Sequence, residues 1–148
     1  MTYGKSFAHE LDARKFDVQL RLYKLKMKTL WKDFVTADKK DKRRIENTIN
    51  ASVEHWNEMF PKGENYFDLH WMTVKGALDY VRKIVEATEN TKKKTYVYLE
   101  TGKGNNSSHG IEKIKRELKK KFGDELGYNI DEHPKNHGVL RMVVKGTK

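Results

Sequence analysis

The sequence predicts an α/β protein, a two-layer α+β sandwich in which two helices precede strands and helices in the order βαβαββ. Two observations predict this class. Residues 7–60 carry apolar side chains at helical spacing with a single interruption, and after Gly63 short apolar strands alternate with helical segments. We therefore expect two regions, an N-terminal helical hairpin over residues 1–62 and an α/β domain over residues 63–148.

The helical hairpin is expected to consist of two antiparallel helices joined by a short turn. Residues 7–35 contain neither glycine nor proline, and one apolar stripe runs along them, made of Phe16, Leu20, Tyr23, Met27, Leu30 and Phe34 and widened by Leu22 and Trp31. Asp38 is placed to cap the second helix, which stops at Pro61. Its apolar face carries Ile45, Ile49, Val53, Trp56 and Phe60.

The α/β domain is expected to form a four-stranded mixed sheet. Right-handed crossovers make the first strands parallel, and a closing turn at 133–138 makes the last strand antiparallel to its predecessor. Two helices would cover one face, and we expect the helical hairpin to cover the other face in part. The predicted strands are residues 65–70, 95–100, 128–132 and 139–144, and the helices are residues 73–90 and 109–122.

Composition limits the function classes. The net charge is +10, from 31 Lys and Arg against 21 Asp and Glu, which favours an acidic polymer such as nucleic acid, although a merely lysine-rich protein would show the same balance. The absence of cysteine excludes disulfides, thiolate nucleophiles and cysteine-based zinc sites. No long apolar run and no signal-peptide core occur, so we expect a soluble, cytoplasmic protein without a membrane partner.

The first candidate site is the pair Asp68 and His70. Residues two apart on a strand share a face, so a carboxylate lies beside an imidazole at a strand end that feeds a helix. His70 can act as a general base near neutral pH, and Asp68 can orient its ring. One carboxylate and one imidazole are too few for a zinc site. On spacing alone, a turn-capping aspartate and a surface histidine are the simpler explanation of the pair.

The second candidate site is the loop from Thr101 to Ser108. Its glycines allow close backbone approach to a phosphate, and the following helix offers free N–H groups. The loop does not match a Walker A motif, and an ordinary β-to-α loop remains the alternative. The candidate phosphate-binding residues are Gly102, Lys103, Gly104, Asn105 and Ser107 in the loop, with Lys113 and Lys115 on the next helix and Trp71 as a possible base-stacking ring.

Together these motifs resemble the Smr (small MutS-related) domain. Asp68-Leu69-His70 stands before a helix that contains Ala77-Leu78, and Thr101-Gly102-Lys103-Gly104 follows, as in that family. The resemblance covers residues 65–145, and the continuation of the loop is similar to the eukaryotic branch. The helical hairpin is similar to the extension that often precedes eukaryotic Smr domains.

The resemblance implies a fold like the C-terminal domain of translation initiation factor 3, together with nicking or endonuclease activity. By position, Asp68 and His70 would be the catalytic pair, and Gly102, Lys103 and Gly104 the phosphate-binding loop. The family usually has glycine where this chain has Trp71. Either the turn is rebuilt and Trp71 contacts RNA, or activity is weakened and the domain mainly binds.

The resulting hypothesis is an RNA endonuclease that cleaves mRNA on stalled or collided ribosomes, in no-go and nonstop decay. It would act without metal or cofactor, as a monomer, with mRNA and the ribosome as partners. Ubiquitin-linked factors would join through regions outside this chain. The alternatives are a non-catalytic RNA- or ribosome-binding module and a DNA nicking endonuclease, which would need a divalent ion.

Overall fold

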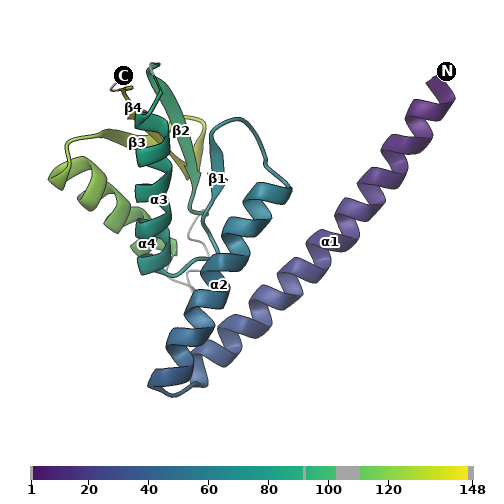
Figure 1. Cartoon of the computed structure of the whole chain (residues 1–148), viewed down its shortest axis with the longest axis horizontal. Helices are drawn as coiled ribbons and strands as arrows, with labels where there is room; N and C mark the ends of the chain where they lie inside the picture. Colours follow the sequence, from purple (N-terminus) through teal and green to yellow (C-terminus); the bar gives the residue numbers. More distant parts are fainter. Residues whose placement is uncertain (1, 92, 103–110, 147–148) are drawn as a thin grey trace.

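The computed structural model describes residues 2–91, 93–102 and 111–146. Two helices precede the order βαβαββ, as expected (Figure 1). Among the described residues, no helix combines the length and apolarity needed to cross a membrane. The elements are α1 (Thr2–Thr36), α2 (Lys39–Met59), β1 (Tyr66–Asp68), α3 (Val74–Glu89), β2 (Thr95–Glu100), α4 (Ile111–Leu118), the π-helical segment η1 (Lys119–Glu125), β3 (Asn129–His133) and β4 (Asn136–Val144).

The four strands form one mixed sheet in the order β1-β2-β4-β3. β1 and β2 are parallel, and β4 runs antiparallel to both of its neighbours, which confirms the expected strand directions. The register pairs Asp68 with Glu100, the last residues of β1 and β2. Because parallel strands end at the same edge of a sheet, the two carboxylates are brought together there.

Helices α3 and α4 pack on one face of the sheet, where side chains of the strands contact them. The ring of Phe67 on β1 lies 5.9 Å from that of Tyr80 on α3, and Glu132 on β3 is paired with Lys115 on α4. The sheet contributes fully buried side chains to this layer, namely Val97, Leu99, Leu140, Met142 and Val144. No helix of the described residues covers the opposite face, which we call the open face: Tyr96 of β2 is 45% exposed there.

Helices α1 and α2 form the expected antiparallel hairpin, held by aromatic side chains. Asp38 caps α2 by accepting a hydrogen bond from the Asp41 N–H, 2.9 Å away. The rings of Tyr23 and Trp56 stack with centroids 4.3 Å apart, and Phe16 packs beside them. Leu22 does not widen the stripe, since it is 56% exposed.

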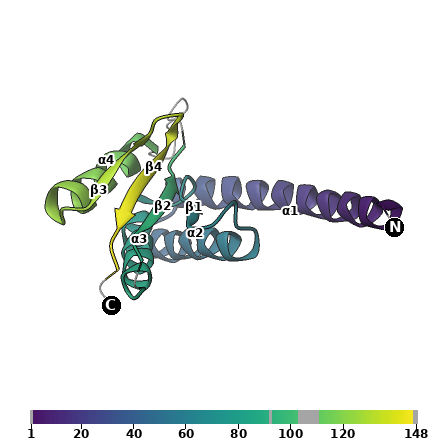
Figure 2. The same ribbon diagram turned by 90° about the horizontal axis from the view of Figure 1, so that it is seen from above.

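The hairpin does not cover the open sheet face in the way that the sequence suggested. α2 packs beside β1 and α3, at the edge of the sheet (Figures 1 and 2). The physical reason lies in the edge strand, whose backbone groups need partners. The side-chain amide of Asn57 on α2 donates to the Asp68 carbonyl at 2.9 Å and accepts from the Asp68 N–H at 3.1 Å.

Several element ends differ from the sequence prediction. β1 ends at Asp68, because the carboxylate of that residue accepts the N–H of His70 and turns the chain. β4 begins at Asn136, since the β3–β4 hairpin closes with only Pro134 and Lys135 in its turn. The last helix continues as a π-helical segment to Glu125, beyond the expected end at Phe122.

Candidate active site

His70 stands in a tight turn between β1 and α3. The N–H of Leu69 donates to the Glu100 carbonyl at 2.8 Å, and the N–H of Met72 donates to the Leu69 carbonyl at 2.9 Å. Leu69 and Met72 are fully buried, so their side chains anchor the turn on both sides of His70. Thr73 then caps α3 by accepting a hydrogen bond from the Gly76 N–H. This local frame fixes the backbone that carries the imidazole.

Asp68 and His70 form a hydrogen-bonded pair. Nδ1 of His70 lies 2.6 Å from Oδ1 of Asp68, and the same oxygen accepts the His70 backbone N–H at 3.1 Å. We assign the hydrogen to Nδ1, because the ionised carboxylate can only accept. Nε2 then keeps its lone pair, and with 30% of the His70 side chain exposed it is the ring nitrogen available to a substrate. The arrangement suits a general base held in one tautomer.

Three residues that the sequence did not single out complete the cluster. Nζ of Lys62 lies 3.1 Å from Oδ2 of Asp68 and 2.7 Å from Oε1 of Glu100. The hydroxyl of Tyr66 donates to the same Glu100 oxygen at 2.8 Å. Glu100 could have been found from the sequence, because parallel strands that end together place Asp68 and Glu100 side by side. Lys62 and Tyr66 carried no such signal.

The contacts of Asp68 keep it ionised. Burial by itself would raise the pKa of its carboxyl group, but the hydrogen bond to His70 and the charges of His70 and Lys62 outweigh burial, so the pKa lies below the ordinary value of 3.8. For Lys62, burial would lower the pKa, but the hydrogen bonds and charges of Glu100 and Asp68 raise it. Burial and the bond to Glu100 raise the pKa of Tyr66, which stays a neutral donor.

The same cluster contains donors that could hold a metal ion. Asp68, His70 and Glu100 each offer one ligand atom, and these atoms lie within 4.8 Å of one another. The sequence had suggested only two such donors. However, the ammonium group of Lys62 lies between the two carboxylates, and a cation could use all three donors only by displacing it. Lys62 thus already supplies a positive charge at this position.

The phosphate-loop candidates are described only in part. Thr101 is fully buried, and the N–H groups of Thr101 and Gly102 both donate to the Gly138 carbonyl, at 2.8 and 3.1 Å. Gly102 has φ of 91°, a backbone angle that favours glycine. The other candidates, Lys103, Gly104, Asn105 and Ser107, lie outside the described residues.

Trp71 does not offer the stacking surface proposed for it. It is only 8% exposed, and its backbone carbonyl accepts the indole N–H of Trp31 at 2.7 Å. Its ring packs near the imidazole of His70, with centroids 5.1 Å apart. A ring this buried supports the turn under His70 and leaves little surface for a base.

The two lysines proposed on α4 differ in their surroundings. Lys115 is paired with Glu132 at 2.8 Å, and only 13% of its side chain is exposed, so it is committed to holding α4 against β3. This ion pair and the hydrogen bond to His137 lower the pKa of Glu132 to about 2. Lys113 is exposed and keeps its ammonium group available.

Side chains of the helical hairpin form hydrogen bonds with the residues on both sides of His70. Besides Asn57, which holds the Asp68 backbone, Asn50 on α2 accepts from the Thr73 N–H and donates to the Thr73 hydroxyl at the start of α3. Trp31 on α1 holds the Trp71 carbonyl. Side chains from α1 and α2 therefore brace both ends of the turn that carries His70.

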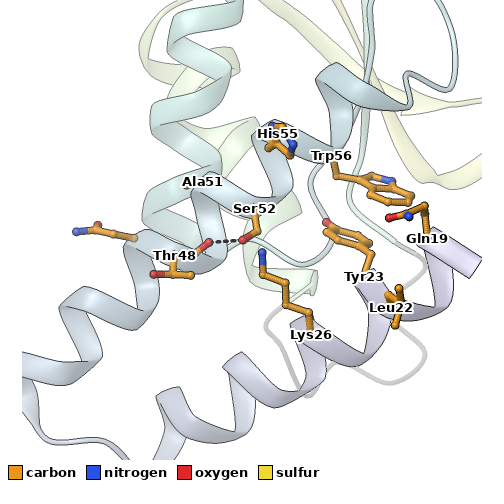
Figure 3. Close-up of a pocket in the computed structure, with 10 residues that line it drawn as sticks. Gln19, Leu22, Tyr23, Lys26, Thr48, Ala51, Ser52, His55 and Trp56 are labelled. Atoms are coloured by element: carbon orange, nitrogen blue, oxygen red, sulfur yellow. Dashed lines mark hydrogen bonds between the residues drawn. The ribbon is translucent and has the colours of Figure 1, made fainter.

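A hollow of about 560 Å³ lies between α1 and α2, apart from the Asp68–His70 pair. Figure 3 shows Leu22, Tyr23 and Lys26 of α1 opposite Ser52 and Trp56 of α2. Among the residues that line it, none belongs to the acid–base cluster. We therefore place the candidate active site at the end of β1 and β2.

Comparison with known proteins agrees with the fold. No protein-family model matches the chain, and no curated protein matches it. Among solved structures, the chain is similar to the solution structure of the B3BP Smr domain, with 23% sequence identity and a TM-score of 0.50. The match covers 68% of this chain and 95% of that one. The chain thus has the fold of an Smr domain, which confirms the fold expected from the resemblance of its motifs.

Proposed function

We propose that this chain is an endoribonuclease of the Smr type. The observation that carries the proposal is the Asp68–His70 pair: Nδ1 of His70 lies 2.6 Å from the carboxylate, and the imidazole is 30% exposed, which leaves Nε2 as the ring nitrogen for a substrate. RNA supplies its own nucleophile in the 2′-hydroxyl, so a single oriented base can start strand scission. The net charge of +10 favours a polyanionic substrate.

The proposed reaction is an internal transesterification. Nε2 of His70 takes the proton of the 2′-hydroxyl, the O2′–P bond forms, and the P–O5′ bond breaks. The 5′ oxygen leaves with a proton taken from water, and the hydroxide left behind takes the proton from the His70 imidazolium, which restores the neutral base. The products are a 2′,3′-cyclic phosphate and a free 5′-hydroxyl. Asp68 holds the ring through Nδ1 and stabilises the imidazolium that forms.

Two cations would balance the charge of the substrate. Lys62 offsets part of the negative charge of Asp68 and Glu100 and so reduces their repulsion of an incoming phosphate. Lys103 and the N–H groups of the loop that begins at Gly102 would stabilise charge on the phosphate, as the resemblance implies. Lys62 in this position supports a reaction that needs no metal.

We further propose that the substrate is mRNA on stalled or collided ribosomes in the cytoplasm, and that the chain acts there as a monomer. The resemblance to the eukaryotic Smr branch supports this assignment.

A cleavage assay on ribosome-bound mRNA tests the proposal. The wild-type chain should cleave, and mapping of the 5′ ends should locate the cuts. His70→Ala and Asp68→Asn should lose cleavage while they keep RNA binding. Binding without cleavage by the wild type on every substrate would instead support a non-catalytic RNA-binding module.

A second candidate is a metal-dependent nuclease that nicks DNA, favoured by the three donors of Asp68, His70 and Glu100. In this case Asp68, His70 and Glu100 would hold a divalent ion in place of the Lys62 ammonium group, and the ion would supply an activated water molecule. Preference for duplex DNA and loss of activity on chelation would identify it.

A further inference from the structure

The open face of the sheet contains a hollow of about 340 Å³ close to the acid–base cluster. Its floor is Val139 of β4, which is only 3% exposed although it lies on the face away from α3 and α4. The loop at 63–64 borders the hollow on one side, and the β3–β4 turn borders it on the other. Aromatic side chains from three strands line it: Tyr66, Tyr98 and His133.

These three rings form one row across the open face. The rings of Tyr66 and Tyr98 are register partners on adjacent strands, nearly parallel at 20°, with centroids 6.4 Å apart. The imidazole of His133 lies 6.1 Å from the ring of Tyr98. All three side chains are partly exposed. Rings that stay accessible on a sheet face are suited to stacking on flat, unpaired bases.

Hydrogen-bond donors stand at the end of this row. Nδ1 of His133 accepts the Lys135 N–H at 3.1 Å, so in the neutral ring Nε2 carries the hydrogen and donates. Oδ1 of Asn136 accepts the Gly138 N–H at 2.9 Å, which leaves the side-chain NH₂ group to donate. These groups can donate hydrogen bonds to the carbonyl oxygens and ring nitrogens at the edge of a base.

The hollow connects directly to the acid–base cluster. Tyr66, which lines it, donates to Glu100, and Glu100 is bound to Lys62, which in turn contacts Asp68. Glu64 and Glu100 make this side of the hollow acidic, which disfavours a phosphate inside it. A nucleotide would therefore place its base in the hollow and its phosphate toward His70 and Lys62.

We propose that this hollow binds one unpaired RNA base next to the phosphodiester that is cleaved. The occupant follows from the row of rings, the donors at its end and the continuity with the acid–base cluster. The proposal rests on the proposed function, since it assigns the base site of the same reaction. It makes the enzyme selective for single-stranded RNA, because a paired base cannot enter the hollow.

The test compares Tyr98→Leu with Tyr96→Leu in the full chain. Both residues lie on the open side of β2, two positions apart, but only Tyr98 lines the hollow. Affinity for a fluorescent single-stranded RNA is measured in a His70→Ala background, which prevents cleavage. Tyr98→Leu should weaken binding about tenfold, the effect of losing one base–ring stack, whereas Tyr96→Leu should change it less than about twofold. When His70 is present, the cleavage rate of Tyr98→Leu should also fall about tenfold, and the ends of the products should be unchanged.

The outcomes separate this inference from the proposed function. If the wild type cleaves RNA and Tyr98→Leu binds as well as the wild type, the base site is wrong but the enzyme assignment stands. If Tyr98→Leu and Tyr96→Leu lose the same RNA affinity, the RNA contacts the whole open face, and the assignment of the base to the hollow is overturned. A wild type that neither binds nor cleaves RNA overturns both proposals. His133→Ala gives a second test at the hollow if Tyr98→Leu does not fold, as thermal unfolding would show.

Discussion

Asp68 uses both carboxylate oxygens and both backbone polar groups at once. Oδ1 holds His70, Oδ2 holds Lys62, and the backbone is held by Asn57. Its carboxyl group is buried but surrounded by donors, which is the condition under which a buried charge remains stable. At the scale of the single residue, the site depends on this carboxylate remaining ionised.

The lowered pKa of Asp68 predicts how stability depends on pH. A carboxyl group whose pKa is lower in the folded state stabilises the fold above its ordinary value of 3.8, and this contribution is lost as the pH falls through the folded value. The unfolding free energy of the wild type should therefore exceed that of Asp68→Asn most clearly near neutral pH. Urea unfolding of both proteins measures the difference, and it should shrink below pH 3.8. If the difference in unfolding free energy between the two proteins stays constant with pH, Asp68 is not held ionised by its contacts in the folded state.

Lys62 predicts the response of the cluster to metal ions. Lys62→Ala removes the ammonium group between Asp68 and Glu100, so the two carboxylates and His70 become free to bind a divalent cation. Calorimetric titration with Mn²⁺ should detect tighter binding to this variant than to the wild type.

Lys83→Ala is the matched control for this titration. Lys83 also forms an ion pair, with Glu54 at 2.6 Å, but it lies outside the cluster. Its substitution should leave Mn²⁺ binding unchanged. Equal Mn²⁺ affinity of the wild type and Lys62→Ala would show that Lys62 does not occupy the cation position.

At the scale of elements, α2 acts as the missing neighbour of the edge strand β1. Asn57→Ala leaves the buried N–H and C=O of Asp68 without partners, and each such group costs about 1–3 kcal/mol. We expect the unfolding free energy to fall by roughly 2–4 kcal/mol in urea titrations. Asn47→Ala, on the exposed side of the same helix, should change it by less than about 0.5 kcal/mol. Similar values for both variants would contradict the bracing role of Asn57.

The helices and strands could be predicted from the sequence, but some of their ends and contacts could not. The spacing of apolar residues was enough to locate the helices and strands. Ile45, Ile49 and Val53 recur every four residues on the buried face of a helix, and Val97 and Leu99 lie two residues apart on the buried face of a strand. This spacing could not show that β1 ends at Asp68, since that depends on a carboxylate accepting a backbone N–H. Nor could it place α2 at the β1 edge, where the amide side chains of Asn57 and Asn50 hold Asp68 and Thr73.

The candidate site was predicted in part for a similar reason. Asp68 and His70 are close in sequence, so a local pattern was enough to pair them. Lys62 and Glu100 reach them only through the loop before β1 and the register of β2, which are tertiary features. The sequence could not show that Trp71 is only 8% exposed, because its burial depends on tertiary packing.

At the scale of the whole molecule, the net charge of +10 predicts salt-dependent binding. Affinity for single-stranded RNA should fall linearly with salt on logarithmic axes, with a slope of about −0.7 for each phosphate neutralised. Fluorescence anisotropy over a salt series measures the slope. Lys113→Ala should reduce it, because this lysine is exposed, whereas Lys115→Ala should not, because Lys115 is paired with Glu132. An affinity independent of salt would exclude a polyanion as the main ligand.

The chemistry of the cleaved ends distinguishes transesterification with His70 as the base from hydrolysis that needs a metal ion. Ribosome-bound mRNA is incubated with the wild type and with His70→Ala in the presence of EDTA, and the new ends are analysed. We predict 2′,3′-cyclic phosphate and 5′-hydroxyl ends from the wild type, no loss of activity with EDTA, and no cleavage by His70→Ala. Ends with 5′-phosphates, formed only when a divalent ion is present, would contradict this prediction.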